Sequence, residues 1–243
     1  MERIISSHDI TTLQYAVDQD PDKIAFRWGT TLLFSVIQVN ERTMFNILAP
    51  HFVRGGVLNS VTQDTGGSAL HVALQHRVRT VPILAWPLMQ LGIDLNIVSF
   101  ERRTALHEAL EHGHSDLAVK LIEMGINIDI IDTHGLTELM LAITNEAVEV
   151  VHALLARGVN VNLRDETSSS FNWSSRTALH CAVRTNNIDI IDAILNRGSQ
   201  RPDLSATENH LMAVQVAEML RFDNIQAMLT TAMNNIGAGL GGV

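Results

Sequence analysis

The sequence contains an internal repeat, and this feature constrains the fold more than any other. Four six-residue stretches align, each starting with Ser or Thr, with Leu at the third position and Ala at the sixth. They cover residues 68–73, 104–109, 137–142 and 177–182, so they recur at similar intervals, of which the last is the longest. In the last three, a glycine (Gly125, Gly158, Gly198) follows the threonine at the same distance. A chain with such a period is expected to fold as a stack of similar units, each packing on its neighbours, rather than around one globular core.

These stretches resemble the ankyrin-repeat family, whose units recur about every 33 residues with a Thr-Pro-Leu-His-x-Ala signature. The second and fourth stretches carry its Thr, Leu, His and Ala, with Ala105 and Ala178 in place of Pro, and the first has Ser68 in place of Thr. The third is degenerate, with Met140 in place of His. The resemblance implies an all-α solenoid of helix-turn-helix units with finger loops, and it covers nearly the whole chain.

From these positions we expect a single repeat domain over residues 1–235. Two weaker units, near Thr30 and Met212, extend the array at either end. The expected parts are an N-terminal helical cap at 1–28 with a lone helix at 8–20, repeats at 29–66, 67–102, 103–135, 136–175 and 176–207, and a C-terminal capping repeat at 208–235. The glycine-rich residues 236–243 are expected to form a flexible tail.

The chemistry of the repeated positions agrees with helix pairs. The Ser or Thr that opens each stretch can cap a helix, because its oxygen accepts from backbone N–H groups that lack a partner in the first turn. By resemblance, the histidines hydrogen-bond locally and tie each finger turn to its helix. The later glycines stand where a helix ends in a left-handed residue. An excess of residues near Pro82 and Pro87, relative to the other repeats, predicts that the second helix of the 67–102 repeat is kinked, broken or lengthened.

Composition and charge exclude several classes of protein. The 243 residues carry a formal net charge of -9, which argues against binding to nucleic acid or to anionic membranes. Cys181 is the only cysteine, which excludes an intramolecular disulfide framework and a Cys-rich zinc module. The uncharged run at residues 80–93 falls short of the ~20 residues that span a bilayer. We expect a soluble protein of the cytoplasm, or of a host cytoplasm if the chain is a secreted effector.

No catalytic constellation emerges from the sequence. His107 and His112 are five residues apart, whereas a zinc-binding pair on one helix face needs a spacing of four. Cys181 follows a histidine whose role is structural by resemblance, and position 181 varies among the repeats. Asp129 and Asp132 fall on predicted turns and are expected to be solvated. We expect no catalytic residues, no metal and no cofactor.

The resemblance implies a protein-binding groove formed by the finger tips and the exposed side of each first helix. Trp, Tyr and Arg are the residues that most often anchor interfaces. Our preferred patch is Phe100, Arg103, Trp173 and Arg184, with Trp173 in a Ser-rich insertion at residues 167–175. The full set of expected partner-binding residues is Phe100, Arg102, Arg103, Glu111, His112, His134, Phe171, Trp173, Arg176 and Arg184.

We therefore expect a non-enzymatic monomer that binds another protein and acts as an adaptor or an inhibitor. In that interface, arginine side chains would contact acidic groups of the partner. Bacterial effectors and immunity-type inhibitors of toxins both fit this class. Two alternatives stay open: an enzyme with a site in the irregular regions 78–100 and 165–176, and a self-assembling module that uses the same patch.

Overall fold

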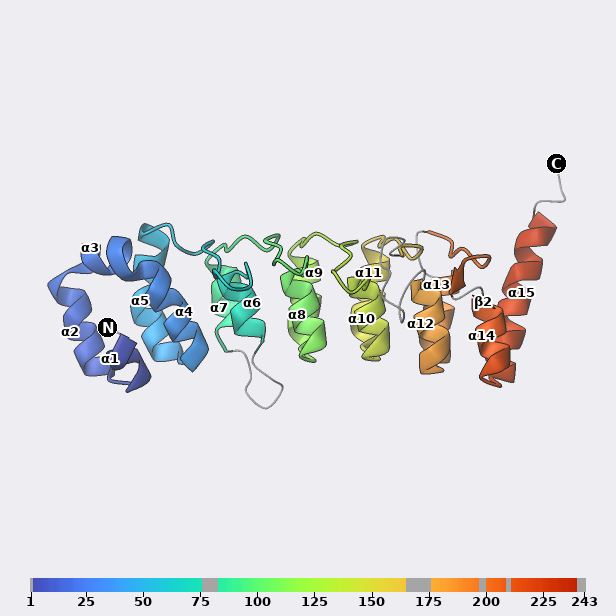
Figure 1. Ribbon diagram of the computed structural model, residues 1–243, viewed down its shortest axis with the longest axis horizontal. Helices are drawn as coiled ribbons and strands as arrows, with labels where there is room; N and C mark the ends of the chain where they lie inside the picture. Colours follow the sequence, from blue (N-terminus) through green and yellow to red (C-terminus); the bar gives the residue numbers. More distant parts are fainter. Residues whose placement is uncertain (1, 76–82, 165–175, 197–199, 209–210, 240–243) are drawn as a thin grey trace. The chain divides into compact units, whose positions relative to one another are not determined.

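The structure, a computed structural model, describes residues 2–75, 83–164, 176–196, 200–208 and 211–239. Its contacts divide the chain into two compact units, Met1–Leu117 and Ala118–Val243, with the boundary inside α9 (Ser115–Glu123). Within each unit, short α-helices alternate with extended loops (Figure 1). This is the all-α architecture that the family resemblance of the sequence implies.

The first unit is built from helix pairs that pack side by side. α4 packs on α5 and on α6, and α6 packs on α7 and α8. Between α4 and α5 the core contains Leu32 and Val36 on one side and Phe45 and Phe52 on the other, all buried. The elements are α1 (Glu2–Ser6), α2 (Ile10–Gln19), α3 (Pro21–Lys23), the π-helical turn η1 (Ile24–Trp28), α4 (Gly29–Val39), α5 (Arg42–Arg54), α6 (Ala69–Leu74), α7 (Ala85–Gln90) and α8 (Ala105–Glu111).

The second unit continues the same pattern. Its elements after α9 are α10 (Glu138–Thr144), α11 (Val148–Ala156), α12 (Ala178–Thr185), α13 (Ile188–Asn196), the antiparallel pair β1 (Thr207–Glu208) and β2 (Leu211–Met212), α14 (Ala213–Met219) and α15 (Asp223–Gly239). The first helices of successive pairs, α10, α12 and α14, contact one another in turn. Ala142 and Ala182 are completely buried in these helices, and their small side chains allow the helices to approach closely.

The predicted helix caps are confirmed. Thr104 precedes α8, and its Oγ1 accepts the His107 N–H at 3.4 Å. Thr137 precedes α10, and its Oγ1 accepts the Met140 N–H at 3.2 Å. The glycines that follow α9 and α11 have the left-handed backbone that the sequence predicts, with φ of 89° at Gly125 and 78° at Gly158. The third such glycine, at position 198, lies outside the described residues.

Buried histidines tie two of the capped helices, α6 and α12, to the loops that follow them. The Nδ1 atom of His71 accepts the Ser68 N–H at 3.2 Å, so its proton is on Nε2. Nε2 in turn donates to the carbonyl oxygen of Arg103 at 3.0 Å, which joins two successive repeats. His180 makes the equivalent bonds in the second unit, at 3.4 and 3.2 Å. The local tie that the sequence resemblance implies is therefore present in both units.

Acid should weaken both units through these histidines. Burial lowers the pKa of His71 and of His180 below the ordinary value of about 6.5, because the charged ring would lose its hydration. The unfolded chain therefore binds these protons first as the pH falls, so the stability present above about pH 6.5 is lost below it. We expect the free energy of unfolding, measured by urea denaturation and circular dichroism, to fall between about pH 7.5 and about pH 5.

A double variant isolates the histidine contribution to this decline. Replacing His71 and His180 together with Gln should lower stability at neutral pH but reduce the further loss on acidification. His152→Gln, on α11, is the control whose pH profile should follow the wild type. An unchanged decline in the double variant would assign the acid sensitivity to other groups.

Gly55 permits a close approach between the end of α5 and the π-helical turn η1. A Cβ atom at Gly55 would lie 2.9 Å from the carbonyl carbon of Ala25 and 3.1 Å from the carbonyl oxygen of His51. The same region holds an ion pair between Arg54 and Asp22 at 2.6 Å. A close backbone contact therefore contributes to the packing of η1 against α5.

The two ends of the chain differ from expectation. A helix within the expected residues 8–20 is present as α2, but it is not alone, because α1 precedes it and α3 follows it. His8, whose φ is 57°, separates α1 from α2, and Asp9 caps α2 through the Thr12 N–H at 3.0 Å. At the other end, α15 continues to Gly239, so residues 236–239 are helical rather than a flexible tail. The rest of that expected tail, residues 240–243, lies outside the described residues.

The second helix of the 67–102 repeat is shortened. α7 has 6 residues, whereas α9, α11 and α13 have 9 each. It starts at Ala85 and contains Pro87 in its first turns, where the missing N–H costs little. The sequence predicts that this helix is kinked, broken or lengthened, and for its described part the prediction of lengthening is wrong.

Candidate functional site

Neighbouring loops are connected by side chains that accept backbone N–H groups. The pairs, acceptor first, are Asn59 with Asp94 at 2.8 Å, Asp129 with Asn160 at 2.8 Å, and Asn162 with Asp203 at 2.7 Å. The first pair lies in the first unit and the other two in the second. The loops are thereby held in register, and this fixes the position of side chains at their tips.

Phe100 stands on such a loop as an exposed but positioned aromatic ring. It is 68% exposed, and its backbone N–H donates to the carbonyl oxygen of Thr65 in the preceding loop at 2.8 Å. Its ring lies directly over Gly66, where a Cβ atom would come within 2.7 Å of two ring carbons. Gly66 also has a φ of 67°, which glycine adopts without strain. The prediction that Phe100 lies at the surface is confirmed.

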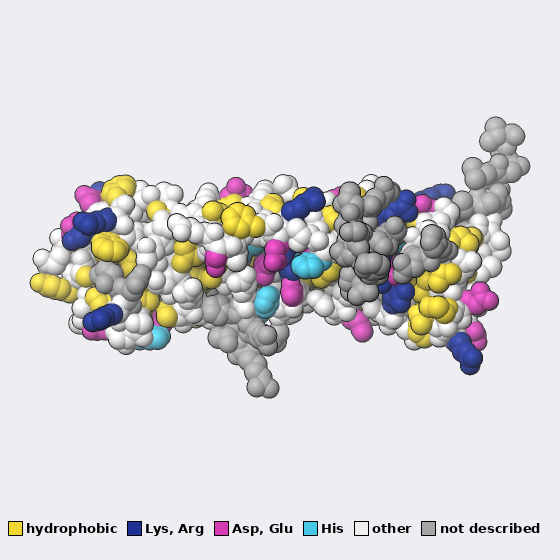
Figure 2. Space-filling view, viewed as in Figure 1, with side chains coloured by type: hydrophobic (Ala, Val, Ile, Leu, Met, Phe, Trp, Pro, Cys, Tyr) yellow, Lys and Arg dark blue, Asp and Glu magenta, His cyan; other side chains and the backbone are white. Residues whose placement is uncertain are grey.

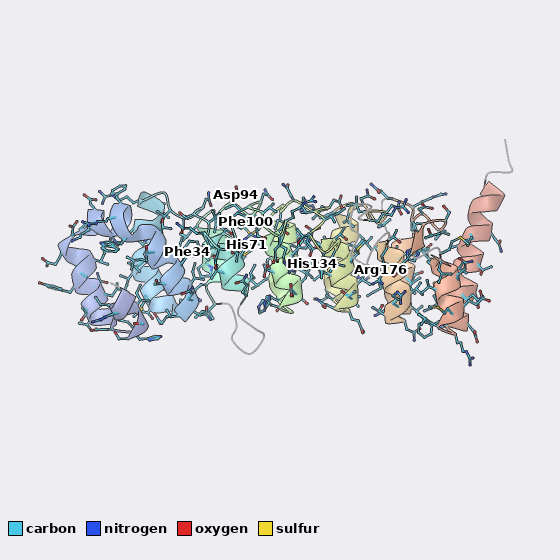
Figure 3. All side chains as sticks on the ribbon, viewed as in Figure 1. Phe34, His71, Asp94, Phe100, His134 and Arg176 are labelled. Carbon is cyan, nitrogen blue, oxygen red and sulfur yellow. The ribbon has the colours of Figure 1, made fainter. Side chains whose placement is uncertain are left out.

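A cavity of about 310 Å³ opens beside this ring. Figure 3 shows Phe100 next to His71, which comes from α6. In Figure 2, acidic side chains gather over α6 and α8 in this part of the first unit. The residues that line the cavity are Asp64, Thr65, Gly67, His71, Gln75, Ser99, Phe100, Glu101 and Glu108.

Arg103 lies inside the first unit and not on its surface, which corrects the expected patch. Its Nε donates to Glu108 Oε1 at 3.0 Å, and its guanidinium also pairs with Glu111. The side chains of Arg103 and Glu108 are only 9% and 8% exposed, whereas Glu111 is 52% exposed. The loop folds back over α8, so that this arginine neutralises a buried carboxylate of its own unit.

His112, at the end of α8, is half-buried beside the same carboxylate. Its Nδ1 lies 3.0 Å from the Glu108 carbonyl oxygen and 3.8 Å from Glu108 Oε2. Its ring stacks on that of His114, with centroids 6.5 Å apart. Arg102, at the tip of the loop, is exposed and has a left-handed backbone with φ of 58°. The structure thus brings Phe100, Arg103, Glu111 and His112 together in the first unit.

The second unit holds the other two predicted arginines around one buried glutamate. Arg176 Nε donates to Glu208 Oε1 at 2.6 Å, and Arg184 Nε lies 3.3 Å from Glu208 Oε2. The Glu208 side chain is 1% exposed, Arg176 is 10% exposed and Arg184 is 37% exposed. This cluster links the start and end of α12 to the β1 strand. Of these charges, Arg184 is the one that reaches the surface.

The remaining predicted residues are separate from these clusters. His134 is exposed, and its Nδ1 lies 3.6 Å from Asp132 Oδ2. The expectation that Asp132 is solvated is wrong, because it is buried and its Oδ1 accepts the N–H groups of His134 and Leu136 at 2.8 and 2.9 Å. Phe171 and Trp173 lie outside the described residues, together with the rest of the 167–175 insertion.

The cavity contains residues that the sequence reasoning did not select. Asp64 and Glu108 line it, and Gly66 supports the aromatic ring. The available signal was the Gly66–Gly67 pair directly before a helix cap, since a double glycine indicates a close approach of other atoms. Glu108 stands where the other repeats have Val72, Leu141 and Cys181, so a charge on this buried position was a second signal.

The residues and regions of the sequence considered for catalysis are Cys181, the two irregular regions and possible metal ligands. Burial raises the pKa of the Cys181 thiol to about 12, so it is protonated at neutral pH. The regions proposed for the alternative enzyme are only partly visible, because residues 78–82 and 165–175 lie outside the described residues. In the described ranges, no group of three or more His, Cys, Asp or Glu residues is placed to hold a metal ion. Over the same ranges, no helix combines the length and the apolar character needed to cross a membrane.

Comparison with known families gives two overlapping matches. A model for three copies of the ankyrin repeat matches residues 84–165, and a model for many copies of it matches residues 139–195. Together the matched ranges run from α7 to α13. No curated protein matches the chain.

Proposed function

Because this chain is an all-α ankyrin-repeat solenoid, with the repeats matched over residues 84–195, we propose that it binds a partner protein along its finger loops and first helices. Ankyrin repeats generally serve as protein–protein interaction modules and are typically non-enzymatic. The chain would act as an adaptor, or as an inhibitor that covers its target. A bacterial effector and an immunity-type protein are the two forms of this role that we put forward.

Phe100 is the observation that carries the proposal. The Phe100 side chain is large and apolar, and 68% of it is exposed to water in the free protein. Burying it against a partner removes this apolar surface from water, which favours binding. Its contact with Gly66 and its backbone bond to Thr65 hold it in place before a partner arrives. Such preorganisation lowers the entropic cost of binding. An exposed, preorganised aromatic residue is the kind of anchor on which interface energy concentrates.

Affinity purification from native lysate tests the proposal. We expect Phe100→Ala to lower retention of a specific partner about tenfold or more, since truncation of an anchor residue costs about 2 kcal/mol. Tyr15→Ala is the matched control, because Tyr15 on α2 is 64% exposed and far from this loop in the sequence. Trp173→Ala tests the second predicted anchor in the same assay. A partner retained equally by the wild type and by both anchor variants would show that the patch is wrong.

A further inference from the structure

The cavity beside Phe100 is surrounded by an excess of negative charge. Asp64, Glu101 and Glu108 line it. Glu111 lies close by, because it pairs with the same arginine as Glu108. That cation, Arg103, is buried and pairs with both Glu108 and Glu111. Three of these carboxylates therefore line the cavity, whereas none of its described lining residues is an Arg or a Lys.

Among the described residues, His71 lines the cavity and Arg102 is the sequence neighbour of Glu101, so these two basic residues are compared with the carboxylates. Burial lowers the pKa of His71, the imidazole at the base of the cavity, so its ring is neutral near pH 7. Arg102 follows Glu101 along the loop but is not one of the lining residues. Because both Asp64 and Glu101 are exposed, they can reorient toward a ligand that enters from solvent.

The aromatic ring adds a second requirement for the ligand. One side of Phe100 rests on Gly66, and Phe100 lines the same cavity as the carboxylates of Asp64, Glu101 and Glu108. The face of an aromatic ring attracts an organic cation positioned within about 6 Å of its centroid. A bare metal ion satisfies the carboxylates but makes little use of an apolar ring, whereas an arginine or lysine side chain uses both.

We propose that this cavity receives an arginine or lysine side chain from a partner peptide, so that the segment bound by the first unit is basic. The inference rests on the protein-binding function proposed above and specifies the chemistry of its ligand. An arginine matches the site best, because its planar guanidinium can pair with a carboxylate and stack on a ring at the same time. An acidic segment would meet like charges here, which reverses, for this unit, the sequence-based expectation that arginine side chains contact acidic groups of the partner.

Selection from a phage-displayed library of random peptides on the full chain tests the proposal. We expect the selected peptides to share an Arg or Lys beside an apolar residue, and to bind more weakly as salt is raised. Exchanging that Arg for citrulline, its neutral analogue, should lower the affinity about tenfold, through loss of a charge-assisted contact. Affinities are measured by fluorescence polarisation with labelled synthetic peptides.

Paired variants locate the binding to this cavity. Asp64→Asn with Glu101→Gln should lower the affinity of the basic peptide about tenfold, because two attractive charges are lost. Glu149→Gln with Glu218→Gln is the control, since it removes two exposed carboxylates from α11 and α14 of the second unit. Phe100→Ala should weaken binding as well, and Tyr15→Ala should not.

The outcomes separate this inference from the proposed function. Selected peptides that lack Arg and Lys, or basic peptides that bind the Asp64/Glu101 variant and the wild type equally, would overturn the inference while leaving protein binding intact. Failure to select any peptide, combined with a lysate experiment in which the wild type retains no specific partner, would overturn both. Basic peptides that require Phe100 and the two carboxylates support the inference.

Discussion

Replacing Glu208 with alanine is expected to destabilise the second unit by about 3 kcal/mol, because it leaves buried positive charge without its counter-ion. The glutamate side chain is 1% exposed and accepts hydrogen bonds from both Arg176 and Arg184. Arg184 is partly exposed, so water screens its share and most of the loss comes from Arg176. The midpoint of urea denaturation measures the effect on the full chain.

Two further variants identify the cause of this destabilisation. Arg184→Ala should cost about 1 kcal/mol or less, because the partly exposed arginine contributes little when water can replace it. Combining Glu208→Ala with Arg176→Ala should recover part of the loss, since no uncompensated charge then stays buried. If the double variant loses as much stability as Glu208→Ala and Arg176→Ala, each measured singly, lose in sum, the ion pair contributes nothing beyond packing.

Replacing Gly55 with alanine is expected to destabilise the first unit by about 2–3 kcal/mol through overpacking. The added methyl group would overlap the backbone of Ala25 in η1, which has no side-chain rotamer to relieve the contact. Gly55 itself has an ordinary backbone with φ of -76°, so conformation alone predicts that alanine is tolerated or slightly stabilising there.

The neighbouring Gly56 is the matched control for this prediction. Its φ is 65°, and no atom lies within 4 Å of the position that a Cβ would take. Gly56→Ala should therefore cost about 1 kcal/mol, from the left-handed backbone alone. Denaturation midpoints of the two variants should rank Gly55→Ala as the less stable, and the opposite ranking would show that η1 moves away without cost.

The sequence predicts those parts of the fold that depend on local chemistry. Thr104 and Thr137 cap helices because a threonine oxygen reaches backbone donors three residues ahead, whatever the rest of the chain does. Gly125 and Gly158 end helices for an equally local reason. The family resemblance, rather than local chemistry, predicts Phe100 at the surface, because its repeat position belongs to a loop tip.

The surroundings of the site depend on contacts that spacing does not reveal. Arg103 is next to a helix cap, where many residues are exposed, but the loop turns it onto Glu108 and Glu111 further along the same helix. The ring of Phe100 meets Gly66 in the loop of the preceding repeat, and only the register of the two loops places them together. The cavity is negative because Arg103 is paired inside the unit while Asp64 and Glu101 stay exposed. The sequence alone does not reveal this pairing, so it predicts acidic rather than basic groups on the partner.

The hydrogen bonds from His71 and His180 to the following loops also limit where residues can be inserted into the chain. In the repeats with His71 and His180, the following loop must return to an imidazole Nε2, because its carbonyl oxygen accepts a hydrogen bond there. The third repeat has Met140 at this position, and the interval that separates it from the next repeat is longer than the two before it. A loop that is not required to meet an imidazole can change its length without losing that bond. The segment after α11 is therefore the place where a foreign peptide could be grafted into this scaffold.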